Sequence, residues 1–164
     1  MFDGKKVLVA LDGSMPSEAM LRFVLDIAGP LDMTVLLLRV VEPLTPVMTP
    51  DVYTAPYEDV EERRRDAEEY LAPIAAALRA RGVATAWAVR RGRPADEILA
   101  AAEESGVDMI AMATHGRTGF GRLLFGSVAE AVLRRATVPV FMIRQPDRVE
   151  TPTAPGAAPK AAVS

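Results

Sequence analysis

Short apolar runs alternate with segments of helical spacing, and this alternation restricts the fold of the chain more than any other feature. Four apolar runs, at residues 7–11, 34–41, 108–113 and 138–143, predict buried strands, and a fifth at 83–89 is weaker because alanines dilute it. Their hydrophobicity is continuous and rich in β-branched residues, which suits strands covered on both faces, as in a parallel sheet. The order predicts an α/β fold, an open doubly wound parallel sheet of five strands with helices on both faces and right-handed crossovers.

Prolines and glycines predict where several helices begin and end. Pro94 suits the first turn of the third helical segment, and Gly82 and Gly106 are placed to stop the second and third. Pro73 falls inside the second helical pattern, so this helix is expected to kink or restart there.

Length and composition predict one domain followed by a tail. A chain of 164 residues suits a single continuous core, which we assign to residues 1–144. Residues 145–164 are rich in Pro, Ala and Thr and have no apolar period, so they cannot bury enough surface to offset the entropy of ordering. We expect this tail to be disordered.

Charge and residue usage exclude several classes of function. A net charge of −3 gives no basic field to attract nucleic acid or an anionic membrane. The chain has no cysteine and one histidine, which excludes disulfides, thiolate nucleophiles and histidine-rich metal sites. No signal sequence and no stretch approaching about 20 apolar residues is present, so we expect a cytoplasmic protein.

The segment 113–127 carries the strongest indication of chemistry. It holds glycines and arginines between a buried strand and a helix whose start is predicted at Ser127, since Ser127 and Glu130 have the spacing of a capping box. Such a backbone can approach a phosphate closely at a helix N-terminus. Alternatively, the glycines only let the chain turn. The usual motifs do not apply: Leu124 occupies the third glycine position of a dinucleotide fingerprint, and no P-loop sequence occurs.

The same segment resembles the universal stress protein family. ATP-binding members of that family carry Gly-x2-Gly-x9-Gly-Ser/Thr, and this chain has Ala113, Gly116, Gly126 and Ser127 at those positions, with Ala113 in place of the first glycine. Residues 7–14, 38–43, 92–98 and 136–140 also look like family blocks, in the family's order, so the resemblance covers 5–144.

The resemblance implies strand order 3-2-1-4-5 and a nucleotide lying across the carboxyl ends of the strands, where doubly wound sheets bind ligands. It implies that Ala10, Leu11 and Asp12 lie beside the nucleotide, with Asp12 near the ribose or a magnesium ion, and that the backbone of Val40 meets the adenine. The residues expected around the ribose and phosphates are Ala113, Gly116, Arg117, Gly126, Ser127 and Val128.

Three of the candidate residues also have simpler interpretations. The alternative for Asp12 is a local cap only, because aspartate often accepts hydrogen bonds from its own backbone in turns. His115 has no nucleophile with a supporting acid in the sequence, which favours a structural or ribose-edge role over catalysis in its loop. Arg122 is expected to be solvated or to face a dimer partner.

These expectations combine into one leading function and two alternatives. The leading function is an ATP-binding (or ADP- or AMP-binding) stress-response or signalling protein that acts as a nucleotide-dependent homodimer, with an unknown protein partner also conceivable. The dimer is expected to form through the last strand, from Val138 to Ile143, since an exposed apolar edge invites pairing. The alternatives are a slow magnesium-dependent ATPase and a nucleotide-free interaction dimer.

Overall fold

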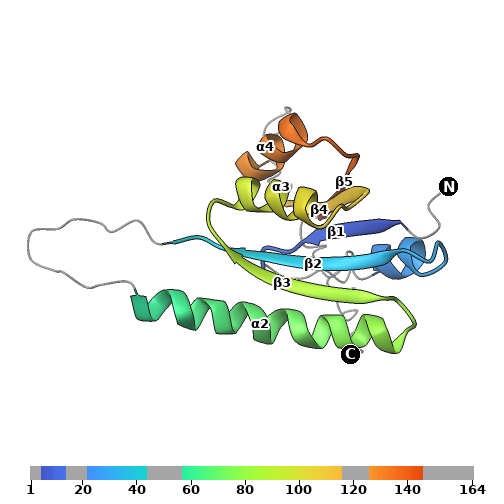
Figure 1. The fold of residues 1–164 in the computed structure, drawn as a ribbon, viewed down its shortest axis with the longest axis horizontal. Coiled ribbons are helices and arrows are strands. Elements are labelled where there is room, and N and C mark those ends of the chain that lie inside the picture. Colours follow the sequence, from blue (N-terminus) through green and yellow to red (C-terminus); the bar gives the residue numbers. More distant parts are fainter. Residues whose placement is uncertain (1–4, 14–21, 44–56, 116–125, 146–164) are drawn as a thin grey trace, which may run out of the picture.

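The computed structural model describes residues 5–13, 22–43, 57–115 and 126–145, and within these ranges strands alternate with helices (Figure 1). The five strands are β1 (Lys6–Ala10), β2 (Thr34–Val41), β3 (Thr85–Arg91), β4 (Met109–His115) and β5 (Val140–Gln145). The helical elements are the short π-helix η1 (Val24–Ala28) and the α-helices α2 (Tyr57–Ala80), α3 (Pro94–Glu104) and α4 (Ser127–Arg135).

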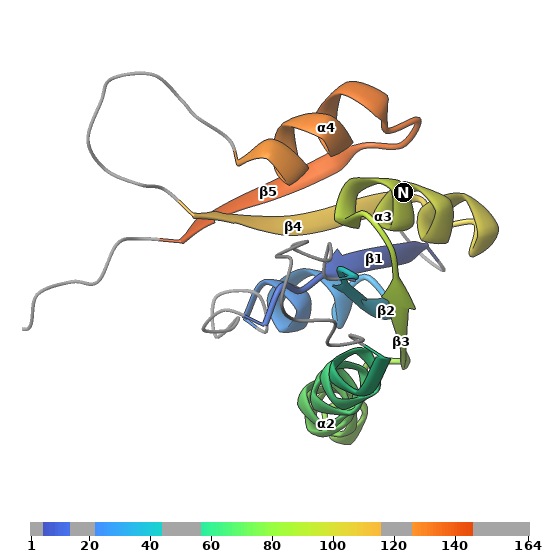
Figure 2. The same cartoon turned by 90° about the vertical axis from the view of Figure 1, so that its left-hand side faces the viewer.

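All strand pairs are parallel, and the sheet order is β3-β2-β1-β4-β5, as predicted. The chain builds outward from β1 to β3 on one side and then crosses to β4 and β5 on the other. The point where the order reverses therefore lies between β1 and β4. The sheet is strongly twisted, so that β4 and β5 lie across the view in Figure 2 while α2 is seen end-on.

Each face of the sheet has its own hydrophobic core. On one face, Val7 and Val9 of β1 lie with residues of β2, η1 and α2, among them Leu71 and Leu78. On the other face, Leu8 lies with residues of α3 and α4. Val7, Leu8 and Val9 are all buried, which explains why the β1 run is continuously apolar and does not alternate.

Strand boundaries differ from the predicted ones by one or two residues. β3 begins at Thr85 and not at residue 83, and β4 continues through His115, so His115 is a strand residue and the expected loop position is wrong. β5 begins at Val140, which leaves Val138 outside the strand. It also includes Gln145, the residue at which the tail was expected to start, and residues 146–164 lie outside the described part of the chain.

Helix boundaries agree with three of the predicted signals. Pro94 is the first residue of α3, and Gly82 and Gly106 follow α2 and α3 with φ of +85° and +57°, as expected for helix stops. The predicted restart at Pro73 is wrong, because α2 runs unbroken from Tyr57 to Ala80 with Pro73 on its exposed side.

The predicted capping box at the start of α4 is also wrong. Gly126 occupies the N-cap, Ser127 is already the first helical residue, and no side-chain capping hydrogen bond is made. A glycine at the N-cap costs only a few tenths of a kcal/mol relative to a serine, so the helix does not need the box in order to begin there.

The amino ends of β1 and β4 are joined through Asp108. Its carboxylate accepts a hydrogen bond from the Lys5 ammonium group at 2.8 Å and another from the backbone N–H of Lys6 at 2.9 Å. The Asp108 N–H donates in turn to the Lys6 carbonyl at 2.8 Å. The hydrogen bond from Lys5, reinforced by the one from the Lys6 backbone, holds the pKa of Asp108 below its ordinary value.

We predict that Asp108→Asn lowers the Tm near neutral pH and that the difference from wild type shrinks in acid. A carboxylate with a depressed folded-state pKa stabilises the protein fully above its unfolded pKa of about 3.9, and this contribution is lost as the pH falls through the folded pKa. Thermal unfolding of both proteins, from pH 7 down to the lowest pH at which they fold, measures this difference in Tm. Glu62→Gln, which changes an exposed carboxylate on α2, is the control. A Tm difference that stays constant over that range would contradict the assignment.

Candidate functional site

The carboxyl ends of three neighbouring strands bring several of the expected site residues to one edge of the sheet. Ala10 ends β1 and is in register with Leu38 of β2 on one side and Met112 of β4 on the other. Val40 lies two residues beyond Leu38 in β2, and Ala113 lies one residue beyond Met112 in β4. The ends of β1, β2 and β4 therefore meet beside the point where the strand order reverses, which is where doubly wound sheets bind ligands.

The segment after β1 is fixed to β2 and then turns sharply. The N–H of Leu11 donates to the Leu38 carbonyl at 2.9 Å, and the Leu11 side chain is buried. The next residue, Asp12, is exposed, and Gly13 has φ of +76°, a conformation that L side chains rarely adopt. The chain thus presents the Asp12 carboxylate to solvent at the carboxyl edge of the central strand.

The expected site residues divide between the two faces of the sheet. Ala10, Val40 and Val128 are partly buried against the core beneath α3 and α4. Leu11 and Ala113 belong with the core on the other face. Neighbouring residues in a strand point to opposite faces, so the side chains of these residues lie on two different faces of the sheet. The feature that all of them share at the edge is their backbone.

The start of α4, the next described element after the carboxyl end of β4, provides a helix N-terminus. Gly126 has φ of −55° and ψ of 157°, and both Gly126 and Ser127 are exposed. The N–H groups of a first helical turn have no partner within the helix, and the helix dipole favours an anion beside them. Glu130 is the first residue of α4 whose N–H meets a carbonyl within the helix, that of Gly126 at 2.9 Å.

Some expected residues cannot be placed. Gly116, Arg117 and Arg122 lie outside the described residues, so the middle of the glycine motif remains a prediction. His115 is described only as the last residue of β4, paired in register with Gln145.

Arg39, which the sequence did not indicate as a site residue, lies directly beside the segment after β1. A methyl group added to Gly13 would lie 2.5 Å from Arg39 Cζ, and the same Cζ lies 5.1 Å from the ring centroid of Tyr70 in α2. The signal that was available is a charged residue inside an otherwise apolar strand predicted to be buried on both faces. Its neighbours in space, Gly13 and Tyr70, are 26 and 31 residues away in sequence.

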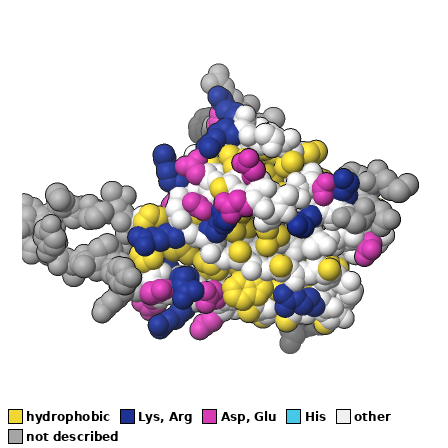
Figure 3. Space-filling view, viewed as in Figure 1, with side chains coloured by type: hydrophobic (Ala, Val, Ile, Leu, Met, Phe, Trp, Pro, Cys, Tyr) yellow, Lys and Arg dark blue, Asp and Glu magenta, His cyan; other side chains and the backbone are white. Residues whose placement is uncertain are grey.

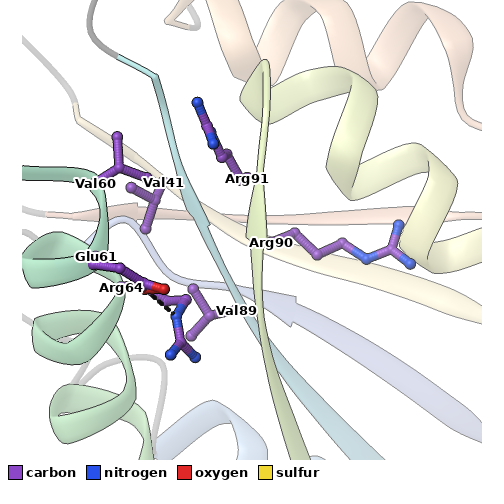
Figure 4. Close-up of a pocket in the computed structure, with 7 residues that line it drawn as sticks. All are labelled: Val41, Val60, Glu61, Arg64, Val89, Arg90 and Arg91. Atoms are coloured by element: carbon purple, nitrogen blue, oxygen red, sulfur yellow. Dashed lines mark hydrogen bonds and ion pairs between the residues drawn. The ribbon is translucent and has the colours of Figure 1, made fainter. Parts of the chain in front are cut away.

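A small hollow lies at the carboxyl ends of β2 and β3, away from the reversal of strand order between β1 and β4. Val41, Val60 and Val89 line it from β2, α2 and β3, and the Glu61 carboxylate accepts a hydrogen bond from Arg64 at its rim (Figure 4). That hydrogen bond lowers the pKa of Glu61. The hollow has a volume of ≈ 140 Å³, below the roughly 300 Å³ at which small-molecule sites begin, so it is too small to hold a nucleotide.

The arginines beside the hollow are engaged elsewhere or point out of it. Arg90 points away toward α3, as Figure 4 shows, and pairs there with Glu97 at 3.5 Å and with Glu104. The hydrogen bond with Glu104 raises the pKa of Arg90 and lowers that of Glu104. In the space-filling view the charged side chains over α2 carry both signs and gather near its start, as is typical of a solvated helix face (Figure 3).

The described part of the chain holds neither a metal-binding cluster nor a membrane-spanning helix. No group of three or more His, Cys, Asp or Glu side chains is arranged to hold a metal ion in that part of the chain. None of its helices has the length and apolarity needed to cross a membrane.

The fold and its sequence match one protein family over nearly the whole described region. The model of the universal stress protein family matches residues 4–144. The chain belongs to the universal stress protein family. Universal stress protein MJ0531 of Methanocaldococcus jannaschii is 32% identical over 145 residues, which cover 88% of this chain and 84% of the relative.

Solved structures of universal stress proteins share the fold. The crystal structure of a family member from Burkholderia pseudomallei is 30% identical with a TM-score of 0.67, over 85% of this chain and 95% of that one. A universal stress protein from Archaeoglobus fulgidus, solved in complex with dAMP, is 24% identical with a TM-score of 0.56, over 87% of this chain and 98% of that one. At that identity the likeness shows the fold alone.

Proposed function

We propose that this universal stress protein binds an adenine nucleotide, ATP or its relatives ADP and AMP, at the carboxyl edge of β1, β2 and β4, and that it acts as a nucleotide-dependent homodimer in stress response or signalling. The observation that carries the proposal is the convergence of Ala10–Asp12, Val40 and Ala113 at the reversal of strand order. Gly116, Gly126 and Ser127 match the glycine motif of ATP-binding family members, which supports adenine nucleotides as the ligand class, and the A. fulgidus protein of the same fold was solved with dAMP.

The residues at this edge suit the parts of a nucleotide. The backbone of Val40 offers an N–H and a carbonyl to the adenine, and the exposed carboxylate of Asp12 can accept hydrogen bonds from ribose hydroxyls. Phosphates would lie against the start of α4 at Gly126 and Ser127, where backbone N–H groups and the helix dipole favour anions. Gly116 and Arg117 would complete the phosphate contacts.

A magnesium ion fits this donor set only as a companion of the phosphates. Mg²⁺ is commonly held by one or two carboxylates together with substrate phosphates and water. Asp12 supplies one exposed carboxylate, and the described residues contain no fuller cluster. Asp12 would therefore hold magnesium that arrives with a nucleoside triphosphate, and the ion would neutralise phosphate charge.

The sharpest test of the nucleotide site is Gly126→Val. Of the described residues, none has an atom within 4 Å of a Cβ placed on Gly126, and its φ of −55° suits any residue. Valine should therefore leave the fold intact while its branched side chain occupies the space of a phosphate. We predict at least a hundredfold loss of ATP affinity in titration calorimetry, with an unchanged circular dichroism spectrum.

Two milder variants should show smaller effects on ATP affinity than Gly126→Val does. Gly126→Ala adds a single methyl group and should lose less affinity than Gly126→Val. Ser127→Ala removes one hydroxyl contact and should leave the stability of α4 unchanged, because Ser127 makes no capping bond. A folded Gly126→Val protein that binds ATP as wild type does would show that the glycine serves only the turn.

We further predict that multiple-turnover ATP hydrolysis is negligible. The histidine of the phosphate segment, His115, is assigned a structural or ribose-edge role, which leaves no obvious general base for the phosphates, and the site as proposed holds the nucleotide without activating water. Phosphate release by the purified protein, with Mg²⁺ and ATP in excess, measures the rate of hydrolysis. Turnover in the usual enzyme range of about 1 to 1,000 per second would refute the binding-protein proposal in favour of an enzyme.

The dimer part of the proposal rests on β5. This strand is an edge of the sheet, and its Phe141 side chain is 39% exposed while it stacks on Phe23 with ring centroids 4.3 Å apart. Unpaired backbone groups beside exposed apolar side chains favour strand pairing with a second copy.

We predict that light scattering gives twice the chain mass of 17.6 kDa at micromolar concentration and that Phe141→Lys shifts the mass toward the monomer. Phe141 is a better probe than Val140, which packs against the core beneath α4. Leu31→Lys changes a side chain of similar exposure, 37%, in the turn before β2, and should leave the mass unchanged. A monomeric wild-type protein would refute the dimer.

A further inference from the structure

Arg39 contacts the backbone of the segment that carries Asp12. A Cβ on Gly13 would lie 2.5 Å from Cζ and Nη2 of Arg39 and 2.7 Å from Nη1, so the guanidinium group occupies the space that a side chain at position 13 would need. Arg39 also directly follows Leu38, whose carbonyl accepts the hydrogen bond from the Leu11 N–H. The backbone of β2 therefore fixes Leu11, and the next side chain of β2 lies against Gly13.

A second element holds Arg39 in place. Its Cζ lies 5.1 Å from the ring centroid of Tyr70, within the range of about 6 Å for an attraction between a cation and an aromatic ring. Tyr70 is partly buried against the core that contains Leu71 of the same helix. The position of the guanidinium is thus coupled to the packing of α2 on the sheet.

We propose that Arg39 is a positioning residue: held by Tyr70, it fixes the Asp12–Gly13 turn in the conformation that meets the nucleotide. This inference rests on the proposed nucleotide site. A turn with φ of +76° at glycine has many alternative conformations, and fixing one of them before binding removes part of the entropic cost of binding. The planar guanidinium group suits this role because it can lie against the ring and the turn at the same time.

The first arm of the test needs no ligand. NMR relaxation on the nucleotide-free protein gives order parameters for the amides of Asp12 and Gly13. We expect rigid values of about 0.85 in wild type and values falling toward 0.6 in Arg39→Gln, with the amides of β1 unchanged. Unchanged order parameters at Asp12 and Gly13 would overturn the proposal, whether or not the protein binds nucleotide.

The second arm measures ATP affinity by calorimetry. We expect Arg39→Gln to weaken binding about tenfold, Arg39→Lys to recover part of the loss, and Tyr70→Leu to weaken binding severalfold, while Tyr70→Phe retains the ring and loses less affinity than Tyr70→Leu does. The control is Arg64→Gln, which changes an exposed arginine of α2 that pairs with Glu61. Wild-type affinity in Arg39→Gln, or equal losses in both Tyr70 variants, would overturn the positioning role.

The two arms separate this inference from the proposed function. If wild type binds no adenine nucleotide and the order parameters still fall in Arg39→Gln, the proposed nucleotide site is wrong. Arg39 then orders a turn that binds no nucleotide, which overturns the positioning role as stated. If Gly126→Val abolishes binding but Arg39→Gln does not weaken it, the nucleotide site stands and the role of Arg39 is wrong.

Discussion

The burial of β1 on both faces is the constraint on which the rest of the structure depends. Val7, Leu8 and Val9 have almost no exposed surface, and β2 and β4 pair with β1 along its two sides. In a strand enclosed in this way, only the two ends are accessible to solvent or to a ligand. Because every strand is parallel, the carboxyl ends of β1, β2 and β4 meet at one edge. The position of the candidate site therefore follows from hydrophobic burial before any ligand chemistry is considered.

Hydrophobic pattern predicted the elements well and their details less well. The continuous apolar runs gave all five strands and their parallel arrangement, because burial on both faces leaves a signal in every residue of a strand. The Pro73 signal failed because packing outweighs a local preference. A proline inside a helix costs about 3 kcal/mol, whereas burying Leu71 and Leu78 of α2 contributes about 1.5 to 3 kcal/mol each, with Ala67 and Ala75 on the same buried side.

The candidate site was predictable where it depends on strand ends and was not predictable where it depends on side chains meeting across the fold. Asp12 and Val40 were expected from the family resemblance, and they lie just beyond or near the carboxyl ends of two predicted strands. Arg39 could be recognised only as a charge in an apolar strand, because its neighbours Gly13 and Tyr70 come from other elements. Contact between residues so far apart in sequence is set by the register of β1 on β2 and by how α2 packs, neither of which a single sequence specifies.

The glycines have different roles at the two ends of the strands, which form the amino edge and the carboxyl edge of the sheet. Gly82 and Gly106 follow α2 and α3, and among the described residues only their chain neighbours would lie within 4 Å of a Cβ on either, so the described structure requires glycine there only for the positive φ. Gly13 and Gly92 follow β1 and β3 at the carboxyl edge. A Cβ there would lie 2.5 Å from Arg39 Cζ or 2.6 Å from Glu97 Oε1. These two glycines supply both a backbone conformation and the space in which a charged side chain lies against the backbone. The amino edge is thus closed by short turns and the Asp108 hydrogen bonds, whereas the carboxyl edge places charged groups of β2 and α3 against the turns that follow β1 and β3.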